Sequence, residues 1–127
     1  MEANKTISPQ LLQHLYAVCY NFSASLIGKK KTREMFDASY QKIKPYFQVL
    51  SIFEITNKNE LIITQSKITD KELLGFTVWI QQFIKELKQF MVGLGKFNIE
   101  SITVEIKDEL EEIGFYDYYK QAMELDY

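Results

Sequence analysis

The chain has little of the two residues that most often build metal and redox sites. Among its 127 residues there is one cysteine, Cys19, and one histidine, His14. A lone cysteine cannot form an intramolecular disulfide, and one cysteine with one histidine falls short of the usual ligand set of a zinc site. No second residue pairs with the histidine in a recognisable nucleophile–base pattern. We therefore expect no metal and no cofactor, assign no catalytic residue, and expect that the protein is not an enzyme.

Helix breakers and long apolar runs are also scarce. Five glycines and two prolines interrupt the chain, so most of it should lie in regular elements. No apolar run approaches the roughly 20 residues that cross a bilayer, and the N-terminus lacks the basic-then-apolar order of a signal peptide. We expect a cytoplasmic protein without a membrane span, forming a single domain over residues 1–127 with residues 1–7 as a flexible N-terminal lead.

Apolar residues spaced by three and four predict two helices in the first third of the chain. Ser8 suits the N-cap of the first helix and Pro9 its first position, while Gly28 can end it in a left-handed conformation. A second helix is predicted over residues 32–44, with Thr32 as its cap and the following proline as its end.

A third helix, predicted over residues 70–94, has the longest pattern. Thr69 and Glu72 form a capping box ahead of it. Its apolar stripe consists of Leu73, Phe76, Ile80, Phe83, Leu87, Phe90 and Leu94, and is widened by Trp79, Ile84 and Met91. A stripe of this width is typical of a helix at the centre of a small domain rather than of a two-stranded coiled coil. We expect this helix to be the spine of the core.

The middle of the chain predicts a β-hairpin. Residues 49–56 alternate between apolar and polar side chains, residues 57–60 (NKNE) have turn chemistry, and residues 61–64 (LIIT) are apolar and β-branched. Two strands alone are marginally stable, so this hairpin must pack on helices or pair with another strand edge.

Residues 98–113 fit two interpretations. The first half alternates as a strand does, whereas the apolar residues of the whole segment share one helical face. Those residues are Ile99, Ile102, Ile106, Leu110 and Ile113. We predict a helix, which Asn98 can cap and Gly114 can end. A short terminal helix, FYDYYKQAMEL, should follow over residues 115–125 with Phe115, Tyr119 and Ala122 inward.

These elements together predict a mostly helical α+β fold, in which two helical hairpins flank one β-hairpin around a single core.

Charge is uneven along the chain. Residues 1–48 contain seven Lys or Arg and three acids, and residues 49–127 contain eight Lys and fourteen acids, for a net charge of −2. The acidic part would repel phosphates, so we expect no nucleic-acid binding, and the polarity favours oriented association with protein.

The stretch SLIGKKKTRE, residues 25–34, concentrates the basic charge. A P-loop is excluded, because Ser23 stands where its first glycine is needed and Lys30 where a hydroxyl is needed. We expect a solvated corner between two helices instead. The side chains that it would offer to a partner are Lys29, Lys30, Lys31 and Arg33.

Acidic side chains in the second half are the expected complement of that corner. Glu105, Glu109 and Glu112 would share the polar face of the helix over 98–113. A di-iron site is excluded because the accompanying histidines are missing, and acid–base chemistry needs a carboxylate in an apolar pocket. We interpret these residues as a partner-contact surface. Three tyrosines lie off the apolar stripes, and we therefore expect them at an interface. They are Tyr116, Tyr118 and Tyr127.

Our leading functional hypothesis is a small non-catalytic interaction or signalling module, an adaptor or regulatory subunit. It would bind a protein partner or a second copy of itself, as a homodimer, through its charged surface and an unpaired strand edge of the hairpin. The alternative is a small-molecule sensor whose aromatic core encloses a ligand pocket.

Overall fold

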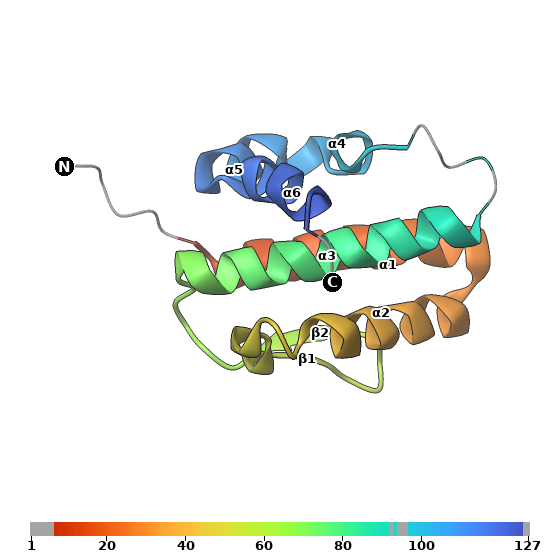
Figure 1. Ribbon diagram of the computed structural model, residues 1–127, viewed down its shortest axis with the longest axis horizontal. Helices are drawn as coiled ribbons and strands as arrows, with labels where there is room; N and C mark the ends of the chain where they lie inside the picture. Colours follow the sequence, from red (N-terminus) through yellow and green to blue (C-terminus); the bar gives the residue numbers. More distant parts are fainter. Residues whose placement is uncertain (1–6, 92, 94–96, 126–127) are drawn as a thin grey trace.

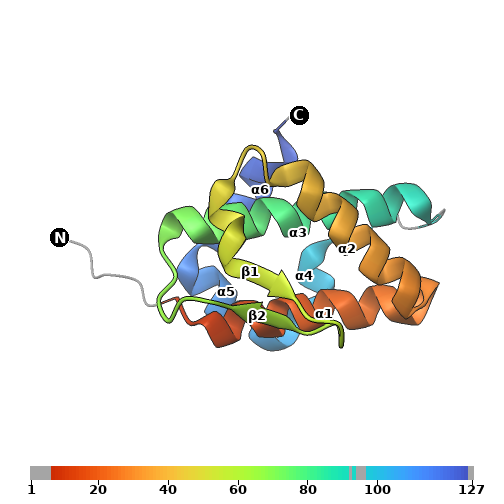
Figure 2. The same ribbon diagram turned by 90° about the horizontal axis from the view of Figure 1, so that it is seen from below.

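The computed structural model describes residues 7–91, 93 and 97–125, which form three layers (Figure 1). The middle layer holds two long helices, α1 (Pro9–Ile27) and α3 (Asp70–Phe90). α3 lies in front of α1 in Figure 1, and both views show the two helices running in the same direction (Figures 1 and 2). The remaining elements cover the two faces of this layer.

One face of the middle layer is covered by α2 (Lys29–Ile43) and by a β-hairpin. A 3₁₀ turn, η1 (Gln48–Ile52), leads into the hairpin, which consists of β1 (Phe53–Ile55) and β2 (Leu61–Ile63) in antiparallel register. Figure 2 shows the hairpin lying over α1 beside α2, while η1 lies over α3. The expected β-hairpin is therefore present, and it is stabilised by packing on helices rather than by a larger sheet.

The opposite face is covered by four short elements, drawn in blue in Figure 1. They are α4 (Ile99–Ile102), the 3₁₀ turn η2 (Val104–Ile106), α5 (Lys107–Ile113) and α6 (Phe115–Met123). α6 packs on α3, and α4 approaches α1. The predicted fold class is confirmed: the chain is mostly helical α+β with one two-stranded antiparallel sheet in the part that the structure describes.

Phe36 of α2 is the centre of the aromatic core between α2 and the middle layer. Its ring stacks on Phe83 of α3 with the centroids 3.7 Å apart, and lies 4.9 Å from the ring of Tyr16 of α1. Trp79 meets it edge-on at 5.8 Å and donates its indole N–H to the Phe36 carbonyl at 3.2 Å. All four rings are buried. These contacts tie α1, α2 and α3 together through one side chain.

The predicted helix caps are confirmed where the hydrogen-bonding partners of the capping residue are close to it in sequence. The Ser8 side chain accepts from the first amides of α1, and Thr69 and Glu72 form the predicted capping box of α3. Asn98 caps α4, and Gly114 adopts a left-handed conformation at the end of α5. Each of these signals depends on hydrogen bonds that span only a few residues.

The predicted start of the second helix was wrong. α2 begins at Lys29, directly after Gly28, whose φ of 88° lets one residue turn the chain between two helices. Thr32 is therefore inside α2 and not its cap. It is buried, and its hydroxyl lies 2.8 Å from that of Ser23 on α1. The pair satisfies two buried hydroxyls at the helix crossing.

The continuous helix predicted over residues 98–113 was also wrong. The helix is broken at Thr103, whose φ of −110° and ψ of 22° are not helical. Thr103 is buried, and its hydroxyl donates to the Ile99 carbonyl at 2.9 Å and lies 2.6 Å from the hydroxyl of Tyr116. Since the Thr103 proton is used on Ile99, Tyr116 is the donor of the second bond. The result is α4, η2 and α5 in place of one helix.

The apolar side chains expected to face inward on α6 do so: Phe115, Tyr119 and Ala122 are buried.

Smaller differences concern element ends. Residues 49–52 belong to η1 and not to a strand. α3 ends at Phe90, and Leu94, the last residue of the predicted stripe, lies outside the described residues. Phe90 is 51% exposed, with the Lys31 ammonium 5.1 Å from its ring centroid. Of the predicted flexible lead, Ile7 is buried, and residues 1–6 lie outside the described part.

The difference between two phenylalanines of α3 gives a test of the core. Phe83→Ala is expected to lower the free energy of unfolding by about 3–5 kcal/mol, because it removes a fully buried ring and leaves a cavity. Phe90→Ala, the matched control on the same helix, should cost about 1 kcal/mol or less, since its ring is half exposed. Urea unfolding measures both. Equal losses in the two variants would contradict the position of the core.

Candidate functional site

Among the three lysines of the basic run, Lys31 makes contacts within the described part of the fold, whereas Lys29 and Lys30 do not. Lys29 and Lys30 are exposed in the first turn of α2. The Lys31 ammonium lies 3.8 Å from a Glu34 carboxylate oxygen, an exposed pair that contributes little to stability. These positions agree with the predicted solvated corner.

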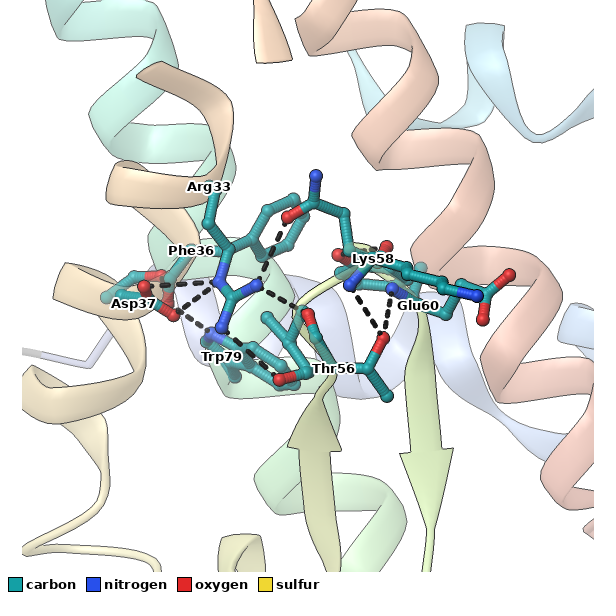
Figure 3. A network of polar contacts seen from close by, with 11 residues as sticks. Arg33, Phe36, Asp37, Thr56, Lys58, Glu60 and Trp79 are labelled. Carbon is teal, nitrogen blue, oxygen red and sulfur yellow. Dashed lines mark hydrogen bonds and ion pairs between the residues drawn. The ribbon is translucent and has the colours of Figure 1, made fainter. Parts of the chain in front are cut away.

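Arg33 is not part of that free surface (Figure 3). Its side chain is 29% exposed and pairs with Asp37 on the same helix at 3.0 Å. The guanidinium also donates to the carbonyls of Ile55 at 3.2 Å and Thr56 at 2.7 Å, and to the side-chain oxygen of Asn59 at 3.1 Å. The prediction that Arg33 is available to a partner was therefore wrong, because the turn of the hairpin uses its donors.

The hairpin turn explains why an arginine is needed there. Thr56 accepts from Asn59 N at 2.9 Å and donates to Glu60 O at 2.8 Å, and Asn59 has a φ of 64°. This is a three-residue turn closed by a left-handed residue. The guanidinium reaches the Asp37 carboxylate, the carbonyls of Ile55 and Thr56 and the Asn59 side chain from three separate nitrogens, a spread of donors that the single nitrogen of an ammonium does not have.

Helix side chains also occupy the outer edges of the hairpin. Tyr40 of α2 donates to Leu50 O at 2.7 Å and lies 3.2 Å from Phe53 O on β1. Gln13 of α1 donates to Leu61 O on β2 at 3.0 Å. With the Arg33 bond to Ile55, helix side chains reach three outward carbonyls of the hairpin, those of Phe53, Ile55 and Leu61. The unpaired strand edge expected from the sequence is therefore covered at these positions.

The predicted acidic surface is exposed but less regular than expected. Glu105 belongs to η2, whereas Glu109 and Glu112 belong to α5, so the boundary between these two elements separates the first from the other two. Glu109 and Glu112 lie near His14 of α1, at the end of the molecule opposite the α1–α2 corner (Figure 1). The structure thus does not bring the two predicted charged groups together within one chain. Among the described residues, no cluster of three His, Cys, Asp or Glu side chains could hold a metal ion.

The tyrosines expected at an interface are not all on the surface. Tyr116 is buried and bonded to Thr103, and Tyr118 is half-buried. Tyr127 lies outside the described residues. Tyr116 instead lines a cleft that the sequence did not predict. The cleft lies on the side of α3 opposite the aromatic core.

This cleft lies between α3 and the α4–α6 layer and has a volume of about 540 Å³. With 3.6 residues per turn, Gln81, Ile84 and Lys88 project from the side of α3 opposite Phe83. The side chains that form the cleft's floor are apolar or aromatic: Ile84, Phe97, Ile99, Tyr116 and Tyr119. The charged side chains around it are Lys85, Lys88, Glu100 and Lys120, and Met123 lies at its exposed edge.

The floor is held in place from below. The bond between Tyr116 and Thr103 fixes α6 to the segment after α4. Tyr119 is buried close to Cys19 of α1, and this burial raises the pKa of its hydroxyl. Phe97 stacks on Phe22 of α1 with centroids 4.9 Å apart. The walls of the cleft are thus built mostly on helices packed against the core, and Phe97 and Asn98 come from the connection between α3 and α4.

The remaining titratable groups of the core do not suggest chemistry. Burial raises the pKa of the Cys19 thiol to about 12, so the thiol stays protonated at neutral pH and is a poor nucleophile. Burial likewise raises the pKa of Tyr16, whose hydroxyl donates to the Asn59 carbonyl. The cleft offers binding groups, with no nucleophile beside a base among its described residues.

No protein-family model, curated protein or solved structure matches the chain. In the described part of the chain, no helix has the length and apolar character to cross a membrane.

The role of Arg33 can be separated from that of the neighbouring lysines. Arg33→Ala should lower the free energy of unfolding by about 1–3 kcal/mol, because oxygens of the hairpin turn lose their donor. Arg33→Lys should recover little of this loss. Lys30→Ala, an exposed position on the same helix, should stay within about 0.5 kcal/mol of the parent. Urea unfolding measures the free energy of unfolding of all three variants. If Arg33→Ala is as stable as Lys30→Ala, the bonds from Arg33 do not stabilise the hairpin turn.

Proposed function

We propose that the protein is a non-catalytic small-molecule-binding module, a sensor, whose ligand occupies the cleft between α3 and α6. The observation that carries the proposal is the cleft itself. Its volume of about 540 Å³ falls in the range of roughly 300–1,000 Å³ that is typical of ligand pockets. An apolar floor with a few polar groups at the rim is also the usual composition of such sites.

The site differs from the one that the sequence suggested. The aromatic core around Phe36 was the expected pocket, but its rings pack directly against one another. The cleft uses the other side of α3 and the tyrosine face of α6. A ligand there would contact both the middle layer and the α4–α6 layer. It would therefore stabilise their association by a free energy that rises with the logarithm of the ligand concentration divided by Kd.

Filling the cleft tests this proposal. The probe is N-phenyl-1-naphthylamine, a neutral fluorophore, and binding is followed through the ¹³C-methyl NMR signal of Met123 at the cleft edge. Met35, buried in the core, is the internal reference. We expect the Met123 signal to shift saturably and the Met35 signal to stay. Gln81→Trp should abolish the shift, because position 81 lines the cleft and the larger side chain fills it.

Two controls complete the design. Gln121→Trp places the same side chain on the exposed surface of α6, outside the cleft, and should bind the probe as the parent does. If Gln81→Trp does not fold, Lys120→Trp blocks the cleft from the exposed rim of α6. Equal binding of the probe by the parent and by the filled variants would rule out the cleft as a ligand site.

A second candidate function, oriented association between copies, is favoured by one observation. Exposed lysines of the α1–α2 corner and exposed acids of α5 lie at opposite ends of the molecule (Figure 1). Contacts between unlike ends are head-to-tail, so they would build rings or filaments instead of a two-fold dimer. The residues involved would be Lys29, Lys30 and Lys31 on one copy and Glu105, Glu109 and Glu112 on the next.

Charge reversal tests that association. Changing Lys29, Lys30 and Lys31 together to Glu should leave the fold nearly as stable, since exposed charges contribute less than about 1 kcal/mol each. Association of the parent should weaken as salt rises, and the variant should not associate. Mixing it with a variant in which Glu105, Glu109 and Glu112 are Lys should restore pairing. Sedimentation velocity across a salt series measures this, and identical behaviour of parent and variant would exclude the charged ends as an interface.

A further inference from the structure

The charges around the cleft are unequal and come from both of its walls. Lys85 and Lys88 lie about one turn apart on α3, and Lys120 lies on α6. Glu100 of α4 is the one acid among the residues that line the cleft, so three lysines and one carboxylate give its rim a charge of +2. The whole chain carries −2. The cleft is therefore a positive site on a protein with an excess of acids.

None of these lysines is neutralised by the described part of the protein, where the ion pairs are Lys31–Glu34 and Arg33–Asp37. Lys88 is half-buried, and its ammonium lies 5.7 Å from the ring centroid of Phe97. That contact keeps one positive charge against the apolar wall. A charge beside low-dielectric surface acts on a ligand more strongly than one surrounded by water.

An ordinary surface reason exists for each lysine taken singly. A lysine stem often covers apolar surface while its ammonium stays in water. That reason does not explain why like charges from two helices gather around one apolar hollow, where they repel one another. A bound anion would relieve this repulsion, and its apolar part would cover the floor formed by Ile84, Ile99 and the two tyrosines.

We infer that the ligand of the cleft is an apolar acid, a molecule with one carboxylate, sulfonate or phosphate group on an aromatic or aliphatic body. This inference rests on the proposed function, because it specifies the ligand class of the same cleft. The acid group lies between Lys85 and Lys120 at the rim, and the apolar body lies on the floor. Lys88 adds its charge from the wall beside Phe97.

A matched pair of probes tests the charge requirement. 8-Anilinonaphthalene-1-sulfonate has the ring skeleton of N-phenyl-1-naphthylamine with an added sulfonate. We expect the anionic probe to bind the parent about tenfold more tightly than the neutral one, and this preference to decrease as salt rises. Both affinities are measured through the Met123 methyl signal, which restricts the measurement to the cleft.

The lysines are tested by a double variant, Lys85→Gln with Lys120→Gln, which leaves the Lys88–Phe97 contact intact. It should lose most of the preference for the anionic probe and keep its affinity for the neutral one. The control is Lys67→Gln with Lys71→Gln, two exposed lysines outside the cleft, which should keep the preference.

The outcomes separate this inference from the proposed function. If the neutral probe binds in the cleft and the anionic probe binds no more tightly, the charge requirement is wrong and the ligand site remains. If the double variant keeps the full preference, the assignment to Lys85 and Lys120 is wrong. If neither probe shifts the Met123 signal of the parent, the proposed function is wrong and this inference with it.

Discussion

The packing of the Phe36 ring is the contact on which the arrangement of the long helices depends. One face of the ring stacks on Phe83 of α3, and its neighbour on α1 is Tyr16. The same residue's carbonyl accepts the indole N–H of Trp79. Because α2 reaches both helices of the middle layer through this residue, the spacing of α1 and α3 follows from the thickness of close-packed rings. Gly28 makes the geometry accessible, since it turns the chain from α1 into α2 within one residue.

Arg33 extends this anchoring from α2 to the β-hairpin. It lies about one turn before Phe36, and its guanidinium holds the carbonyls at the hairpin turn while Asp37 orients it. The basic stretch 25–34 therefore has two unlike parts. Its arginine stabilises the fold and its lysines stay in solvent, although they are adjacent in sequence and equal in charge. Packing on helices stabilises the two-stranded sheet, and helix side chains bond to the outer carbonyls of Phe53, Ile55 and Leu61.

One side of α3 packs in the aromatic core and another side lines the cleft, so this helix connects the core to the candidate site. Trp79 and Phe83 close the aromatic core, while Ile84 and Lys88 form a wall of the cleft. A wall built on a helix that is packed on its other side keeps its shape without a ligand. The opposite wall, α6, is fixed by the hydrogen bond from Tyr116. Preorganisation of this kind lowers the ordering cost of binding.

The sequence by itself determined the fold class, the spine helix and most helix ends, because caps such as Thr69 with Glu72 are set by hydrogen bonds within one turn. It also determined that metal and disulfide chemistry are poorly supplied. It did not reveal the roles of Thr32, Arg33 and Tyr116, whose partners lie nine or more residues away on other elements. The cleft was likewise decided by tertiary structure alone. Its walls are α3 and α6, two helices that are far apart in the sequence. A local pattern cannot specify which distant surfaces will meet.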